Sequence, residues 1–276
     1  MTKIPLAKLD SFPFERLKEL VNLKEKICIV GYGLSAESHA PHFTDIIQGI
    51  WSASESNLNP FISADNYRVV SAWFNWRKQI IRKFQRAEAF QMLGKLQQDL
   101  DLTIATQCVD GLIKLNSIDG AYELYGNVFD AKCYGSGHKF SNWPSPNEEM
   151  SETTTCKICG SRCFPDVEMF GWNKKQEVRN ALMDRINRSS LLILVGVDKS
   201  LAPFDDISSE LLTRLPCIEI LEDAIVIREG TLIHNATIKE LEEELEKRLG
   251  NSIRKTGGGS MKNALHCLSH FTASNS

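Results

Sequence analysis

Short apolar runs alternate with amphipathic stretches along most of the chain. Stretches of helical periodicity lie around and between the runs, and residues 64–100 are mostly helical in pattern. Short apolar runs that alternate with helices predict a parallel sheet covered by helices on both faces, in an α/β doubly wound arrangement. The predicted strands are 27–30, 102–106, 190–195, 217–221 and 224–228, and the predicted helices around them include 15–26, 204–215 and 237–249.

Two stretches depart from this alternation. Residues 130–170 are polar, rich in Gly, Ser and Pro, and carry several cysteines, which predicts an inserted lobe rather than part of the sheet. The stretch Lys255–Ser260 has the composition of a flexible linker, and a short amphipathic segment, Met261–Phe271, follows it.

Composition narrows the class of protein. The chain has 276 residues, of which 42% are hydrophobic and 24% charged, as in ordinary globular proteins. A net charge of −3 gives no broad basic footprint for nucleic acid. No apolar run approaches the roughly 18–20 residues that span a bilayer. Met1–Arg16 is polar and interrupted by prolines, unlike a secretory signal, so we expect a cytoplasmic or nuclear protein without membrane or nucleic-acid partners.

The first chemical motif follows the first predicted strand. Gly31-Tyr32-Gly33 is followed by Ser35-Ala-Glu-Ser38, which is typical of a helix start. In this strand–turn–helix arrangement glycines let the backbone approach a phosphate, and the helix N-terminus favours its charge. The glycines alone would also suit an ordinary tight turn.

Six strings in the chain resemble, in order, the signatures of the sirtuin family. The resemblance covers residues 25–249 and implies a Rossmann-like sheet, a small zinc-ribbon lobe and NAD as cofactor. The strings are Gly31–Ser38 with Pro41 and Phe43, Thr106–Leu112, Glu123–Gly126, Cys156–Gly160 running into Pro165–Gly171, Leu192–Gly196 through Ser200, and Ile218–Leu221.

The resemblance also implies site residues. Glu219 stands where the family has an Asn that addresses a ribose, and as an acid it could accept from ribose hydroxyls. Tyr125, Asp110 and Cys108 occupy the catalytic positions. The implied cofactor-binding residues are Gly31, Tyr32, Gly33, Ser35, Glu37, Ser38, Phe43, Gln107, Asp110, Gly196, Ser200 and Glu219.

Several of these positions depart from the family pattern. Tyr125 replaces the His that acts as general base, and the ordinary pKa of a phenol is about 10 against about 6.5 for imidazole. Cys108 replaces an Asn. The remaining departures are Tyr32, His39, His42 and Thr44. Structural strings are kept while chemical residues change together, which indicates altered chemistry or a lost reaction.

Zinc is the metal that the clustered cysteines suggest. Cys156 and Cys159 form one Cys-x-x-Cys half-site, and Cys133 belongs to the other half. The position of its expected partner is Ser136, so His138 or Cys163 would supply the fourth ligand. A vestigial lobe without metal is the alternative.

The domain hypothesis is a single sirtuin-like domain over 1–249, followed by a flexible linker and tail at 250–276. Its parts are a Rossmann core at about 16–50, 86–128 and 172–249, a helical insert at about 51–85 and the zinc-ribbon lobe at about 129–171.

Three functions follow from these features. The first is an NAD-consuming enzyme that removes acyl groups from lysine in a peptide or protein, or transfers ADP-ribose. The second is a catalytically dead relative that senses NAD or ADP-ribose or docks a partner. The third is reworked chemistry on an NAD-like nucleotide, with Tyr125, His39, His42 or Cys108 supplying the reactive groups.

Overall fold

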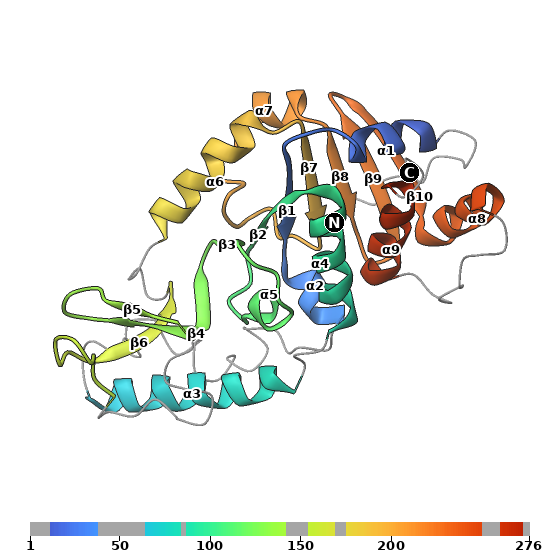
Figure 1. The fold of residues 1–276 in the computed structure, drawn as a ribbon. Coiled ribbons are helices and arrows are strands. Elements are labelled where there is room, and N and C mark those ends of the chain that lie inside the picture. Colours follow the sequence, from blue (N-terminus) through green and yellow to red (C-terminus); the bar gives the residue numbers. More distant parts are fainter. Residues whose placement is uncertain are drawn as a thin grey trace.

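The central feature of the fold is a seven-stranded sheet, in the order β10-β9-β8-β7-β1-β2-β3 (Figure 1). This computed structural model describes residues 12–37, 64–83, 87–141, 154–168, 175–249 and 260–272. The strands are β1 (Lys26–Val30), β2 (Leu102–Thr106), β3 (Tyr122–Glu123), β7 (Leu191–Val195), β8 (Cys217–Ile220), β9 (Ala224–Glu229) and β10 (Leu232–Thr237). Neighbours from β8 to β3 pair in parallel, whereas β9 and β10 pair antiparallel. The predicted parallel sheet is confirmed, with two antiparallel strands added at one edge.

Helices cover both faces of this sheet. One face carries α1 (Phe14–Val21), α4 (Glu88–Leu100) and α9 (Met261–Thr272), and the other carries α6 (Gln176–Arg188) and α7 (Ser209–Arg214). Along β1, Cys28 and Val30 belong to the hydrophobic core on the side of α1, α4 and α9. Ile27 and Ile29 belong to the core on the side of α6 and α7. Because both sides of each central strand are buried, these strands are apolar throughout rather than alternating.

The remaining helices are α2 (Tyr32–Glu37), α3 (Ala64–Arg82), α5 (Leu112–Leu115) and α8 (Ile238–Leu249). Helix α8 packs on α9 and β10, and α2 packs on α4 and α9. No helix in the described ranges is both long and apolar enough to cross a membrane.

A small three-stranded sheet forms the lobe, in the order β5-β4-β6. Its strands are β4 (Gly126–Cys133), β5 (Lys139–Phe140) and β6 (Cys163–Val167). Helix α3 runs beneath this sheet in Figure 1, and the hydroxyl of Tyr67 donates a hydrogen bond to the Cys163 carbonyl at 3.0 Å. The ring of Tyr67 also packs edge-on against Phe164. Helix α3 therefore supports the lobe.

Helix α9 corrects the expectation of a tail after Leu249. Its described side chains are mostly buried against α4, α1, α8 and α2, and the ring of Phe271 stacks on Phe14 at a centroid distance of 6.5 Å. Residues 261–272 therefore belong to the folded core, whereas 250–259 lie outside the described residues. The buried side chains of α9 are Met261, Asn263, Ala264, Leu265, Cys267, Leu268, Ser269 and Phe271.

Candidate active site and metal centre

The glycines after β1 lie against the backbone of the loop that follows β7. A Cβ on Gly31 would stand 2.3 Å from the carbonyl oxygen of Gly196, and one on Gly33 would stand 2.7 Å from the Cα of Gly196. The Gly33 N–H donates to the same Gly196 carbonyl at 2.9 Å. Gly196 has a φ of +55°, a conformation that glycine adopts without strain. All three glycines are thus required by the crossing of two backbone segments, whatever ligand they approach.

Ser35 and Asp110 form a buried polar pair beside this crossing. The Ser35 hydroxyl donates to Asp110 Oδ2 at 2.7 Å, and the Leu112 N–H donates to Asp110 Oδ1 at 3.0 Å. The sulfur of Cys108 lies 3.6 Å from Ser35 Oγ. Burial raises the pKa of the Asp110 carboxyl, although the two hydrogen bonds and Arg77 oppose the rise. Burial and the nearby Asp110 likewise raise the pKa of the Cys108 thiol, so Cys108 is a poor nucleophile here.

Gln107 connects the ends of β2 and β7. Its amide nitrogen donates to the carbonyls of Asp198 and Ala202 at 2.8 and 3.1 Å, and its amide oxygen accepts from the Asp198 N–H at 2.9 Å. Both ends of this side chain are engaged by the loop after β7. Gln107 therefore holds the wall of the site in place.

Tyr125, the residue expected at the general-base position, has two contacts that hold its side chain. Its hydroxyl oxygen accepts a hydrogen bond from the Ala202 N–H at 2.9 Å. The guanidinium of Arg179 lies 4.7 Å from the centre of its ring and is paired with Glu168 at 2.7 Å. Burial raises the pKa of Tyr125, and the Ala202 hydrogen bond and the charge of Arg179 oppose this only in part.

These side chains surround one cavity of about 260 Å³. It opens beyond the carboxyl ends of β1, β2 and β7, where open α/β sheets bind ligands. Its lining residues are Tyr32, Arg77, Gln107, Cys108, Val109, Asp110, Tyr125, Val167, Glu168, Asp198 and Leu201. The structure thus brings together Tyr32, Gln107, Cys108, Asp110 and Tyr125 from three of the matched strings.

Arg77 is a lining residue that the sequence reasoning missed. It lies on α3, is 2% exposed, and places a positive charge near Asp110 and Cys108. A signal was present, because Val70, Phe74, Arg77 and Ile81 recur at helical spacing on one face. A charged residue on an otherwise apolar face is unusual and points to a function.

Three other expected cofactor residues have partners within the protein. Glu219 pairs with Lys199 at 2.7 Å. The Ser200 hydroxyl donates to Asp198 Oδ1 at 2.7 Å. Glu37 accepts from the Lys262 N–H at 3.1 Å, so it caps the start of α9. These residues lie outside the lining of the cavity.

Five positions of interest fall outside the described residues, and their expected roles stay predictions. They are Ser38, His39, His42, Phe43 and Thr44.

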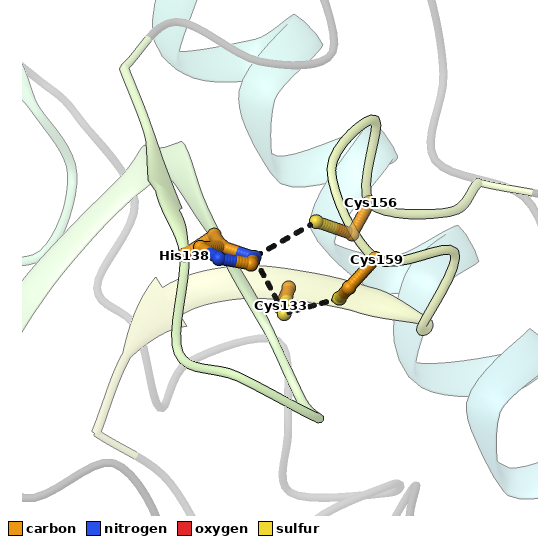
Figure 2. A group of neighbouring side chains, drawn as sticks. All are labelled: Cys133, His138, Cys156 and Cys159. Atoms are coloured by element: carbon orange, nitrogen blue, oxygen red, sulfur yellow. Dashed lines mark hydrogen bonds between the residues drawn. The ribbon is translucent and has the colours of Figure 1, made fainter.

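A group of four metal-ligand side chains lies in the lobe. Figure 2 shows Cys133, His138, Cys156 and Cys159 converging from two turns, and their ligand atoms all lie within 4.8 Å of one another. The Sγ atoms of Cys133 and Cys159 are 3.5 Å apart. The Nδ1 atom of His138 lies 3.7 Å from Cys133 Sγ and 3.3 Å from Cys156 Sγ. A tetrahedral zinc ion with its usual bond lengths separates sulfur and nitrogen ligands by roughly 3.5–3.8 Å. The donor set and spacing therefore fit zinc.

Of the two candidates for the fourth ligand, the structure brings His138 into this group. Cys163, the alternative, is not a member: its thiol lies 4.0 Å from the Ser161 carbonyl and is fully buried. The N–H groups of Ser136 and Ile158 donate to the sulfurs of Cys133 and Cys156 at 3.3 and 3.4 Å. Such hydrogen bonds stabilise thiolates that hold a metal.

Comparison with known proteins agrees with this geometry. The Sir2 family model matches residues 31–203, which contain the glycine crossing, the cavity residues up to Leu201 and the lobe. The chain belongs to the Sir2 family.

Individual relatives of this Sir2 protein support the assignment. It is 27% identical over 180 residues to an NAD-dependent protein deacylase of Aquifex aeolicus, covering 64% of this chain and 74% of that protein. It is 28% identical over 193 residues to an NAD-dependent protein deacylase of Aeropyrum pernix, covering 69% and 77%.

Solved structures of the family share its fold. A Sir2 homolog–NAD complex superposes with a TM-score of 0.60 at 25% identity, covering 76% of this chain and 82% of that one. A complex of a Sir2 homologue with ADP-ribose gives a TM-score of 0.65 at 22% identity over 94% and 96% of the two chains.

Proposed function

We propose that this protein binds NAD or ADP-ribose in the cavity beyond β1, β2 and β7, and that its active site is altered so that Tyr125 is not a general base at neutral pH. In class it is an NAD-dependent deacylase or ADP-ribosyl-transferring protein. Relatives named as deacylases and a neighbour named as an NAD complex support the class and the ligand.

The cavity offers a nucleotide one buried positive charge and a fixed polar pair. Arg77 supplies a positive charge, and Ser35 and Asp110 form a fixed polar pair beside Cys108. NAD, when bound, supplies the ADP-ribosyl group for the chemistry of this class. The protein's own residues would exclude water, orient the ligand through Asp110, and hold the loop after β7 through Gln107.

The observation that carries the proposal is the environment of Tyr125. A general base is most effective with a pKa near the working pH, and burial moves the pKa of this phenol further from neutrality. Its oxygen also accepts the Ala202 N–H, so the phenol proton remains available for donation. We infer that Tyr125 orients a ligand hydroxyl rather than removing its proton.

Calorimetry with NAD and ADP-ribose, together with nicotinamide release in the presence of NAD and an acetyl-lysine peptide, tests the proposal. We expect binding of at least one ligand, little peptide-dependent release at pH 7, and a gain of release in Tyr125→His. Tyr125→Phe, which also lacks a base, is the matched control and should gain nothing.

Each other outcome contradicts a defined part of the proposal. Rapid peptide-dependent release by the unaltered protein would show that it is an ordinary deacylase. Release without a peptide would point to NAD cleavage or ADP-ribosyl transfer. Absence of binding by both ligands would overturn the assignment of the cavity.

A further inference from the structure

Helix α9 leaves one narrow polar stripe at the surface. Between Met261 and Phe271, every side chain is buried except Lys262, His266 and His270, which recur at intervals of four residues. Residues four apart lie on the same face of a helix, one turn above the other. The two imidazoles are therefore neighbours on the solvent side of an otherwise buried helix.

The distance between these rings is informative. The Nε2 atoms of His266 and His270 are 3.4 Å apart, and the rings meet at 78° with centroids 4.6 Å apart. Two nitrogens bound to one tetrahedral zinc ion, each at about 2.0–2.1 Å, lie roughly 3.3–3.4 Å apart. A direct N–H hydrogen bond usually spans about 2.7–3.2 Å. The observed separation suits a shared zinc ion and is long for a direct hydrogen bond between the rings.

We propose that His266 and His270 form a second site for a divalent transition metal of the zinc type, on α9 and separate from the cysteine group of the lobe. Pairs of histidines four residues apart on a helix are a recurrent zinc-binding arrangement. Two protein ligands leave further positions for water, so this site holds its ion less tightly than the four-ligand site in the lobe.

A solvent-accessible hollow lies beside the histidine pair. A hollow of about 410 Å³ between α4 and α9 is lined by Glu88, Gln91, Met92, Lys95, Lys262, Asn263 and His266, so water can reach His266. Burial lowers the pKa of both imidazoles, which favours the neutral form, in which one ring nitrogen carries no proton and can bind a metal.

Some charged neighbours of the histidine pair oppose a bound cation and others favour it. Lys95 and Lys262 oppose a cation near His266, and Lys95 also acts on His270. The charge of Lys262 is offset by Glu88 at 2.7 Å. Glu242 on α8 adds negative charge near His266. An ion held here would join two turns of α9 and stabilise its docking on the core.

The number of zinc ions bound per chain tests this site in the full-length protein. The comparison is between the unaltered chain and the variants His266→Ala and His270→Ala. His234→Ala on β10 is the matched control. In equilibrium dialysis against free ZnCl₂, we expect both α9 variants to bind one ion fewer than the unaltered chain and His234→Ala to bind as many. Thermal unfolding should show a smaller ZnCl₂-induced rise in Tm for the α9 variants.

Cobalt distinguishes the two sites even if a variant is poorly folded. Co²⁺ bound by thiolates gives intense sulfur charge-transfer absorption, whereas Co²⁺ bound by imidazole and water does not. In the unaltered chain we expect a second equivalent of Co²⁺ to bind without adding sulfur absorption. Equal metal counts in the unaltered chain and both α9 variants would overturn the proposal.

Discussion

The hydroxyl oxygen of Tyr125 accepts the backbone N–H of Ala202 at 2.9 Å, joining the corner between β3 and β4 to the loop after β7. Ala202 is 1% exposed, so its N–H has no solvent to replace this partner. The residue expected at the general-base position therefore also makes a structural contact. This hydrogen bond gives Tyr125 a structural role that does not depend on proton transfer.

Tyr125→Phe should lower the free energy of unfolding. The change removes the acceptor and leaves a buried N–H without a partner, at a cost of about 1–3 kcal/mol. Urea denaturation measures the loss. Tyr122→Phe is the control, because Tyr122 packs on the same core cluster and its hydroxyl makes no hydrogen bond within the described ranges. Equal stability of the two variants would mean that the Ala202 contact contributes little.

Asp110→Asn should change the pH dependence of stability. Asn can accept from the Leu112 N–H and donate to Ser35 Oγ, so the local geometry is kept. Because burial raises the folded pKa of Asp110, the wild type loses stability as pH rises from about 4 through that pKa, and the loss then levels off. Asn lacks this loss. We expect the stability of Asp110→Asn relative to wild type to increase with pH over this window, in denaturation at fixed pH values.

A stability difference that stayed constant across the pH series would show that the Asp110 carboxyl is not perturbed by folding. A difference that decreased with pH would show that its folded pKa is lowered instead.

The two candidates for the fourth zinc ligand predict opposite results. His138→Ala should lose most bound zinc, since three thiolates remain where four ligands are required. Cys163→Ser should keep its zinc. Metal analysis after purification measures both, and circular dichroism checks folding. Zinc loss in Cys163→Ser with retention in His138→Ala would reverse the assignment.

Gly31→Ala should destabilise the protein strongly. The new methyl group would stand 2.3 Å from the Gly196 carbonyl oxygen, a backbone atom that cannot rotate away, and we expect a loss of about 3 kcal/mol or more. Gly94→Ala on α4 is the matched control, because its nearest neighbour, Ile118, is at an ordinary 3.4 Å. Removing a helical glycine should stabilise by about 0.5–1 kcal/mol. Calorimetric unfolding compares the two.

The sheet was predictable because its central strands are buried on both faces. Such strands are continuous apolar runs, and the runs Ile27–Val30 and Leu192–Val195 predict buried strands directly. β10 was missed because it is an edge strand whose Leu232 and Ile233 are 63% and 47% exposed, so no pattern of burial marks it. α9 was assigned to a tail because a glycine-rich stretch precedes it, although its own residues are amphipathic.

Contacts within one motif could be predicted from the sequence, whereas contacts that span the chain could not. Cys108 and Asp110 share one loop, and the motif placed them together. Glu37 stays an expected cofactor residue, and its carboxylate also accepts from the Lys262 N–H, 225 residues away. No local pattern contains such a contact. Likewise, the sequence left His138 and Cys163 open as the fourth ligand, and only the folded turn brings His138 to the three cysteines.

The stacking of Phe14 on Phe271 has a consequence for how the chain reaches its native state. Helix α9 packs between segments made early in synthesis, so the apolar surfaces of α1 and α4 stay uncovered until the ribosome has released residue 271. A nascent chain that stops near residue 250 would carry that bare surface and become a substrate for chaperones or proteases. The same adjacency makes the protein suitable for circular permutation, with a short linker joining residues 272 and 12.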